Sequence, residues 1–114
     1  MRRTEEPFQR INVDDAKRLI DEGQVKVIDV RQPDEWVAGH IPQAEHVPLD
    51  GIVNQPLTTL TGDKESAYLF VCAVGGRSAI ACEVAAAMGF TELYNLEGGT
   101  TAWIKSGLPV NTGT

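Results

Sequence analysis

The side chain best placed for chemistry in this sequence is Cys72, which stands between a run of apolar residues and a short segment with two glycines. Gly75 and Gly76 allow backbone angles that other residues resist, so a tight loop can turn its amide N–H groups inward around a negative charge. A helix that begins near Arg77 or Ser78 adds about half a positive charge at the same place. We therefore expect the pKa of Cys72 to lie below the ~8.5 of a free cysteine. Such a thiolate could attack a sulfur, phosphorus or arsenic centre.

Other candidate groups allow more than one interpretation. Free cysteines are often buried and inert, and Cys82, among the alanines and valines of a helical segment, is interpreted as a core residue rather than a resolving thiol. Arg77 can either brace the loop or face an anion. His40 and His46 lie far from both cysteines in the sequence, so neither a Cys–His pair nor a metal site is predicted, although folding could still bring a histidine close to Cys72.

Segments of two kinds alternate along the chain. Apolar and β-branched runs predict strands over residues 26–30, 44–49, 67–72 and 93–96. A capping Asn12 and a terminal Gly23 predict a first helix, Pro33 begins a short second one that Gly39 ends, and two more are predicted over 78–88 and 100–105. Residues 50–66 are expected to form a loop with at most a helical turn.

This alternation predicts an α/β fold with a mostly parallel sheet that is flanked by helices on both faces. Ligands of such sheets bind beyond the carboxyl ends of the strands. Cys72 directly follows one of those ends, which is the first indication of where the function lies.

The length, composition and net charge limit the number of domains and the kinds of partner. A length of 114 residues with 42% hydrophobic residues fits one domain, residues 1–114 with a core over about 8–110. No apolar run approaches the ~20 residues of a membrane span, and no secretory signal pattern is visible, so we expect a cytoplasmic protein that does not insert in membranes. The net charge of −6 and the lack of a basic stripe argue against nucleic acid and anionic lipid as partners.

Four segments, in order and at plausible spacing, resemble the rhodanese-like family over about residues 11–109. They are Cys72 through four residues to Arg77 and Ser78; Ile28-Asp29-Val30-Arg31; Glu35-Trp36 with Gly39-His40-Ile41-Pro42 and Ala44; and Leu96-Glu97-Gly98-Gly99 with Ala102-Trp103 and Gly107-Leu108-Pro109.

The resemblance implies a five-stranded, mostly parallel sheet and a single-domain sulfurtransferase with Cys72 as the catalytic nucleophile. Cys72 would take a sulfane sulfur from a small anionic donor such as thiosulfate, hold it as a persulfide and pass it to cyanide or a thiol, without a metal or organic cofactor. The implied substrate-binding loop consists of Ala73, Val74, Gly75, Gly76, Arg77 and Ser78. Supporting residues outside the loop, interpreted as a buried ion pair or loop anchors, are Asp29, Arg31, Glu35 and His40.

One departure from the family pattern concerns the sulfur donor. Many sulfurtransferase loops have a basic or polar residue directly after the cysteine, whereas Ala73 and Val74 stand there in this chain. Arg77 is then the only cation of the loop, so weak binding of thiosulfate is expected. A persulfide-donating protein or a small persulfide is the alternative donor.

Two other functions stay open from the sequence. The chain could be a module that carries a persulfide to a protein partner, or binds one without catalysis. Related phosphatases and arsenate reductases use the same fold with one more loop residue, which accepts a tetrahedral oxyanion. The four residues between Cys72 and Arg77 match the shorter form, so this second alternative is less favoured.

Overall fold

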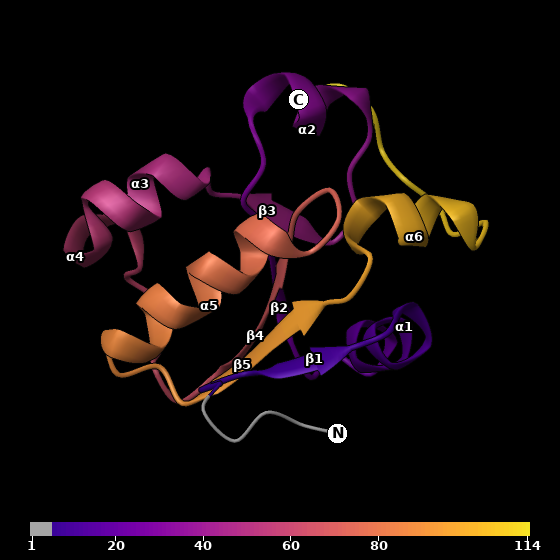
Figure 1. Ribbon diagram of the computed structural model, residues 1–114. Helices are drawn as coiled ribbons and strands as arrows, with labels where there is room; N and C mark the ends of the chain where they lie inside the picture. The colour runs from indigo at the N-terminus through magenta and orange to yellow at the C-terminus, as the bar shows by residue number, and fades with distance from the viewer. Residues whose placement is uncertain (1–5) are drawn as a thin grey trace.

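A five-stranded parallel sheet forms the centre of the computed structural model, which describes residues 6–114 (Figure 1). The strand order is β1-β5-β4-β2-β3, and every neighbouring pair is parallel, which confirms the predicted α/β class. The strands are β1 (Gln9–Ile11), β2 (Lys26–Asp29), β3 (Ala44–His46), β4 (Ala67–Val71) and β5 (Glu92–Leu96).

Helices cover both faces of this sheet. In Figure 1, α3, α4 and α5 lie on one side of the sheet, and α1 and α6 lie on the other. None of the helices within residues 6–114 is long and apolar enough to cross a lipid bilayer. The helices are α1 (Val13–Asp21), α2 (Pro33–Ala38), α3 (Leu49–Asn54), α4 (Pro56–Thr59), α5 (Gly76–Ala87) and α6 (Gly99–Lys105).

The central strand β4 divides its side chains between two apolar clusters. Tyr68 and Phe70 pack in the cluster on the α5 face, whereas Leu69 and Val71 pack in the cluster on the α1 and α6 face. A strand that is covered on both faces carries a continuous apolar run rather than an alternating one. This double burial explains the apolar sequence that leads up to Cys72.

Local capping signals place the helices as the sequence predicts. The side chain of Asn12 accepts a hydrogen bond from the Asp15 N–H at 2.9 Å, which caps α1. Gly23 follows the end of α1 with a φ of +68°, a conformation that glycine adopts without steric cost. At the start of α2, the Gln32 N–H donates to Glu35 Oε1 at 3.0 Å, and Pro33 occupies the first turn.

The predicted elements are wrong in three places. The sequence patterns did not predict the strand at residues 9–11. This strand is short and largely exposed at the edge of the sheet, where it pairs with β5, so it shows no apolar pattern. The strand predicted over 44–49 ends at His46, because Leu49 already begins α3. Residues 50–66 contain α3 and α4, and Ile52 of α3 is fully buried in the cluster on the α5 face.

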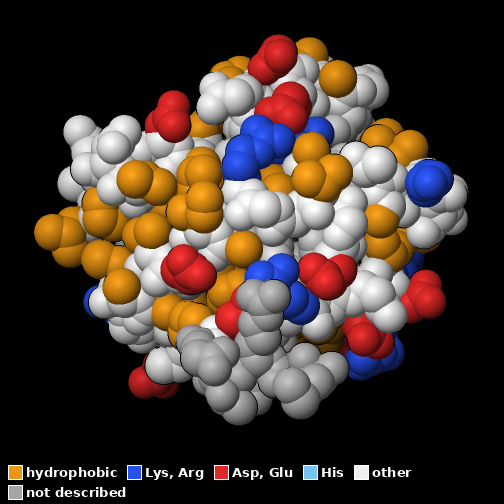
Figure 2. Space-filling model, viewed as in Figure 1, with side chains coloured by type: hydrophobic (Ala, Val, Ile, Leu, Met, Phe, Trp, Pro, Cys, Tyr) orange, Lys and Arg blue, Asp and Glu red, His pale blue; other side chains and the backbone are white. Residues whose placement is uncertain are grey.

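The short helices α3 and α4 also carry apolar side chains on their outer surface. Val53 is 48% exposed and Leu57 is 78% exposed. Figure 2 shows hydrophobic side chains gathered over this part of the molecule, on the left of the view. Mixed exposure of this kind weakens the helical period, which is why the sequence pattern did not reveal these helices.

A buried ion pair joins the end of β2 to the segment after α2. Arg31 donates to both carboxylate oxygens of Asp29, with Nη2 at 2.8 Å from Oδ2, and the same nitrogen donates to the Gly39 carbonyl at 2.7 Å. Asp29 is fully buried and Arg31 is 6% exposed. The pair therefore anchors the segment that bears α2 to the sheet.

Replacing Arg31 with methionine should lower the free energy of unfolding by about 3–5 kcal/mol, because Asp29 would be left as an uncompensated buried charge. Urea denaturation measures this loss. Arg18→Met is the matched control: it breaks an exposed pair with Asp15 and should cost less than about 1 kcal/mol. Equal losses in the two variants would contradict the structural role given to Arg31.

Candidate active site

The carboxyl end of β4 leads into residues 72–75, which connect it to α5 (Figure 1). Together with the first turn of α5 they form the segment 72–78, which we call the loop, and Cys72 is its first residue. Its Sγ accepts a hydrogen bond from the Gly75 N–H at 3.0 Å and lies 3.3 Å from the Ser78 hydroxyl. The Cys72 residue is 1% exposed. The loop thus surrounds a buried sulfur with polar hydrogens.

These hydrogen bonds decide the ionisation of Cys72. Burial alone raises the pKa of the Cys72 thiol. The Ser78 hydroxyl and the backbone N–H groups of Ser78, Gly75 and Val74 lower it, and together they outweigh burial, so the pKa of Cys72 lies below its ordinary value. This is the direction that the sequence predicts for a cysteine in an amide-lined loop.

The N-terminus of α6 holds the outer side of the loop. The Thr100 N–H donates to the Cys72 carbonyl at 2.8 Å, and the Thr101 N–H donates to the Ala73 carbonyl at 3.1 Å. Gly99, at a φ of +58°, permits this approach, since a Cβ there would lie 2.3 Å from the Cys72 carbonyl oxygen. The loop carbonyls therefore bond to α6, while loop N–H groups face the sulfur.

Arg77 braces the loop. Its Nη1 and Nη2 donate to the two carboxylate oxygens of Glu35 on α2, at 2.7 and 2.8 Å. The Arg77 hydrogen bonds lower the pKa of Glu35 to about 2 against the opposing effect of burial, and Glu35 in turn raises the pKa of Arg77. The guanidinium forms a bidentate pair with the Glu35 carboxylate, which favours bracing of the loop over contact with an anion.

Comparison with known proteins agrees with this geometry. The family description of the rhodanese-like domain matches residues 12–106. The chain belongs to the rhodanese-like family.

Relatives within this family carry sulfurtransferase names. The chain is 39% identical over 88 residues to a putative sulfurtransferase of Bacillus subtilis (strain 168), covering 77% of this chain and 82% of the relative. It is 31% identical over 107 residues to the thiosulfate sulfurtransferase GlpE of Pseudomonas paraeruginosa, covering 94% and 93%. The crystal structure of a rhodanese-like domain protein from Staphylococcus aureus matches with a TM-score of 0.79 and 33% identity, over 94% of this chain and 100% of that one.

In this rhodanese-like domain, the supporting residues lie behind the loop rather than at the sulfur. The His40 ring stacks on Trp36 at 3.5 Å between centroids, and its Nδ1 donates to the Trp36 carbonyl at 2.7 Å. The His46 Nε2 donates to the Arg31 carbonyl at 2.8 Å. Backbone carbonyls thus hold both rings, and Arg31 pairs with Asp29. These contacts position α2, which carries the Glu35 that pairs with Arg77.

Cys82 packs in the core of the rhodanese-like domain. It is fully buried, its thiol lies 3.5 Å from the Tyr94 carbonyl, and burial raises its pKa strongly. Both cysteines are free thiols. The structure therefore separates one cysteine with a lowered pKa from one whose surroundings keep it protonated.

Asn95 and Thr100 are site residues that the sequence analysis missed. Asn95 on β5 donates from Nδ2 to the Gly75 carbonyl at 3.0 Å and accepts a short hydrogen bond from the Ser78 hydroxyl. The Thr100 hydroxyl donates to the Cys72 carbonyl at 3.2 Å. The only available signal was that these two buried residues are polar. Their hydrogen-bond partners are 17 to 28 residues away, so no local pattern points to them.

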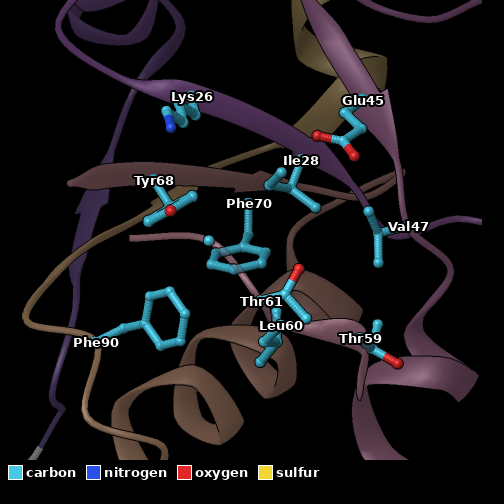
Figure 3. Close-up of a pocket in the computed structure, with 11 residues that line it drawn as sticks. Lys26, Ile28, Glu45, Val47, Thr59, Leu60, Thr61, Tyr68, Phe70 and Phe90 are labelled. Atoms are coloured by element: carbon cyan, nitrogen blue, oxygen red, sulfur yellow. The ribbon is translucent and has the colours of Figure 1, made fainter. Parts of the chain in front are cut away.

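A separate pocket lies on the α5 face of the sheet, away from the loop (Figure 3). It has a volume of about 160 Å³, and the rings of Tyr68, Phe70 and Phe90 stand together at its side. Lys26 and Tyr68 belong to the first residues of β2 and β4, whereas Cys72 follows the last residue of β4. Among residues 6–114, no cluster of three His, Cys, Asp or Glu side chains is arranged to hold a metal ion.

Glu35→Gln should destabilise the protein at neutral pH, because it removes the carboxylate that braces Arg77. Glu35 has a pKa of about 2 in the folded protein against 4.5 ordinarily, so its contribution is complete above about pH 4.5 and is lost as the pH falls toward 2. The difference in urea midpoint between wild type and variant should therefore shrink over this range. The exposed Glu65→Gln serves as control, and a constant difference for Glu35→Gln at all pH values would count against the ion pair.

Proposed function

We propose that this protein is a sulfurtransferase that carries a sulfane sulfur as a persulfide on Cys72. The observation that carries this proposal is the ring of donors around Sγ, from the Gly75 N–H and the Ser78 hydroxyl, which lowers the pKa of a buried thiol. Sulfurtransferase relatives at 31–39% identity support the reaction class. The donor and the acceptor are part of the proposal.

In the first step, the Cys72 thiolate attacks the outer sulfur of the donor. With thiosulfate, a new S–S bond to Sγ forms while the bond between the two donor sulfurs breaks, and sulfite leaves with the bonding electron pair. The negative charge passes to the outer sulfur of the new persulfide. Preorganised N–H groups and the N-terminus of α5 stabilise that charge without rearrangement.

In the second step, a thiophilic acceptor attacks the outer sulfur of the persulfide. The S–S bond to Cys72 breaks, its electron pair returns to Sγ, and the thiolate is restored. With cyanide the product is thiocyanate, and with a thiolate it is a new persulfide. The donor product leaves before the acceptor reacts, which is a ping-pong sequence.

The charge of the loop favours a persulfide donor over thiosulfate. Arg77 is the only cation within the loop 72–78, and its guanidinium is paired with Glu35. The loop tip carries Val74, which is 68% exposed. A doubly charged donor therefore meets backbone N–H groups but no free loop cation, so a small or protein-bound persulfide of lower charge is the better substrate, and a carrier role toward a protein partner is the second candidate.

Cys72→Ser should abolish persulfide formation, because a serine hydroxyl does not form a stable S–S bond. The measurement is the intact mass after incubation with thiosulfate or a thiol persulfide, without reductant. Wild type should gain one sulfur atom that cyanide removes.

Cys82→Ser is the matched control and should gain the same sulfur, because Cys82 is fully buried in the core. Loss of the gain in both variants would contradict the role assigned to Cys82. Turnover of an aryl phosphate by wild type, with no sulfur gain from any donor, would replace the proposal with the phosphatase alternative.

Val74→Lys should raise kcat/KM for thiosulfate by about fivefold to tenfold at low ionic strength, because it places a free cation at the exposed loop tip near a dianion. The gain should fall as salt is added. Val74→Gln is the uncharged control. A similar rate gain in both variants, or none for lysine, would show that loop charge does not select the donor.

A further inference from the structure

Asn95 is a polar residue at a buried position of the sheet, where an apolar side chain is usual. It is fully buried on β5, and its sheet partner on β4 is Phe70. Leu93, two residues earlier and on the same face of the strand, packs in the apolar cluster of the α5 face. A buried amide is unfavourable unless its donors and acceptors are satisfied, so the contacts of Asn95 must account for its presence.

The hydrogen bonds fix the orientation of the Asn95 amide. The Gly75 carbonyl can only accept, so the group that faces it at 3.0 Å is the Nδ2 donor. The Oδ1 acceptor then faces the Ser78 hydroxyl, which donates to it through a short hydrogen bond. One side chain thereby bonds both ends of the segment 75–78.

The two residues that Asn95 bonds, Gly75 and Ser78, both also contact the Cys72 sulfur. Gly75 donates its N–H to Sγ at 3.0 Å, and the Ser78 hydroxyl lies 3.3 Å from Sγ. Gly75 has a φ of +111°, a conformation outside the ordinary backbone range. Glycine adopts this conformation readily but is also free to leave it, and the hydrogen bond from Asn95 to the Gly75 carbonyl restricts that freedom.

We propose that Asn95 is a positioning residue that holds the Gly75 N–H and the Ser78 hydroxyl on the Cys72 sulfur. The role of Asn95 in catalysis rests on the proposed function, the transfer of sulfur through Cys72. The hydrogen bonds of the Asn95 side chain go to Ser78 and Gly75 and not to Sγ. Asn95 acts through these two loop residues, which contact Sγ themselves.

The test is the pH dependence of Cys72 alkylation by iodoacetamide, followed by intact mass, in wild type and Asn95→Leu. This assay reads the thiolate fraction and needs no sulfur donor, so it stands even if the proposed sulfur transfer fails. Asn95→Leu should raise the apparent pKa of Cys72 by about one unit, so the midpoint of the alkylation profile should move to higher pH by about that amount. An unchanged or lowered apparent pKa would overturn the proposal.

Leu93→Val is the matched control, because it alters the same strand and face at a position whose sheet partner is Tyr68 of β4. It should leave the alkylation profile of Cys72 unchanged while it lowers stability. If both variants shift the profile alike, Asn95 is only a core residue and the proposal fails. If Asn95→Leu does not fold, Asn95→Ser replaces it: this side chain is too short to bridge Gly75 and Ser78, and the same rise in pKa is expected.

The double variant Ser78→Ala/Asn95→Leu tests whether Asn95 acts through Ser78. Part of the Asn95 effect is already lost when the hydroxyl is absent, so the combined shift should be smaller than the sum of the single shifts. Fully additive shifts would show that Asn95 and Ser78 act independently, which would contradict the proposal.

Discussion

The Cys72 sulfur is buried, yet the hydrogen-bond donors around it favour its charged form. Burial by itself favours the neutral thiol, as Cys82 demonstrates in the same core. Donors from Gly75, Ser78 and Val74 reverse this preference at Cys72. Since N–H groups and one hydroxyl supply the stabilisation, the exact path of the backbone from β4 into α5 matters more than any charged side chain.

Three neighbouring elements hold that backbone path. The N-terminus of α6 bonds to the carbonyls of Cys72 and Ala73, β5 bonds to Gly75 and Ser78 through Asn95, and α2 bonds to Arg77 through Glu35. A parallel sheet makes this arrangement possible, because the carboxyl ends of its strands and the segments that follow them meet at one edge. The same arrangement commits Arg77 to bracing, which leaves the loop with little charge for attracting a dianion.

Much of the fold could be predicted from local patterns. The apolar run of β4, the alanine-rich segment of α5 and the capping by Asn12 each depend on neighbours within a few residues. The short edge strand β1 and the helices α3 and α4 could not be predicted, because their side chains are partly exposed and their contacts are with other elements. Strand β1 pairs with β5, α3 packs against α5, and α4 packs against α3. For the same reason the predicted strand over 44–49 was too long: β3 ends at His46 and α3 begins at Leu49.

By itself, the sequence determined that a cysteine stands between a buried strand and a glycine-containing turn into a helix, and this local order already implies an amide-lined sulfur. Only the tertiary structure decided which residues hold that turn. Glu35 is 42 residues from Arg77, and Asn95 is 17 from Ser78. Pairings over such separations depend on how the strands are ordered in the sheet, and no periodicity within the chain records that order.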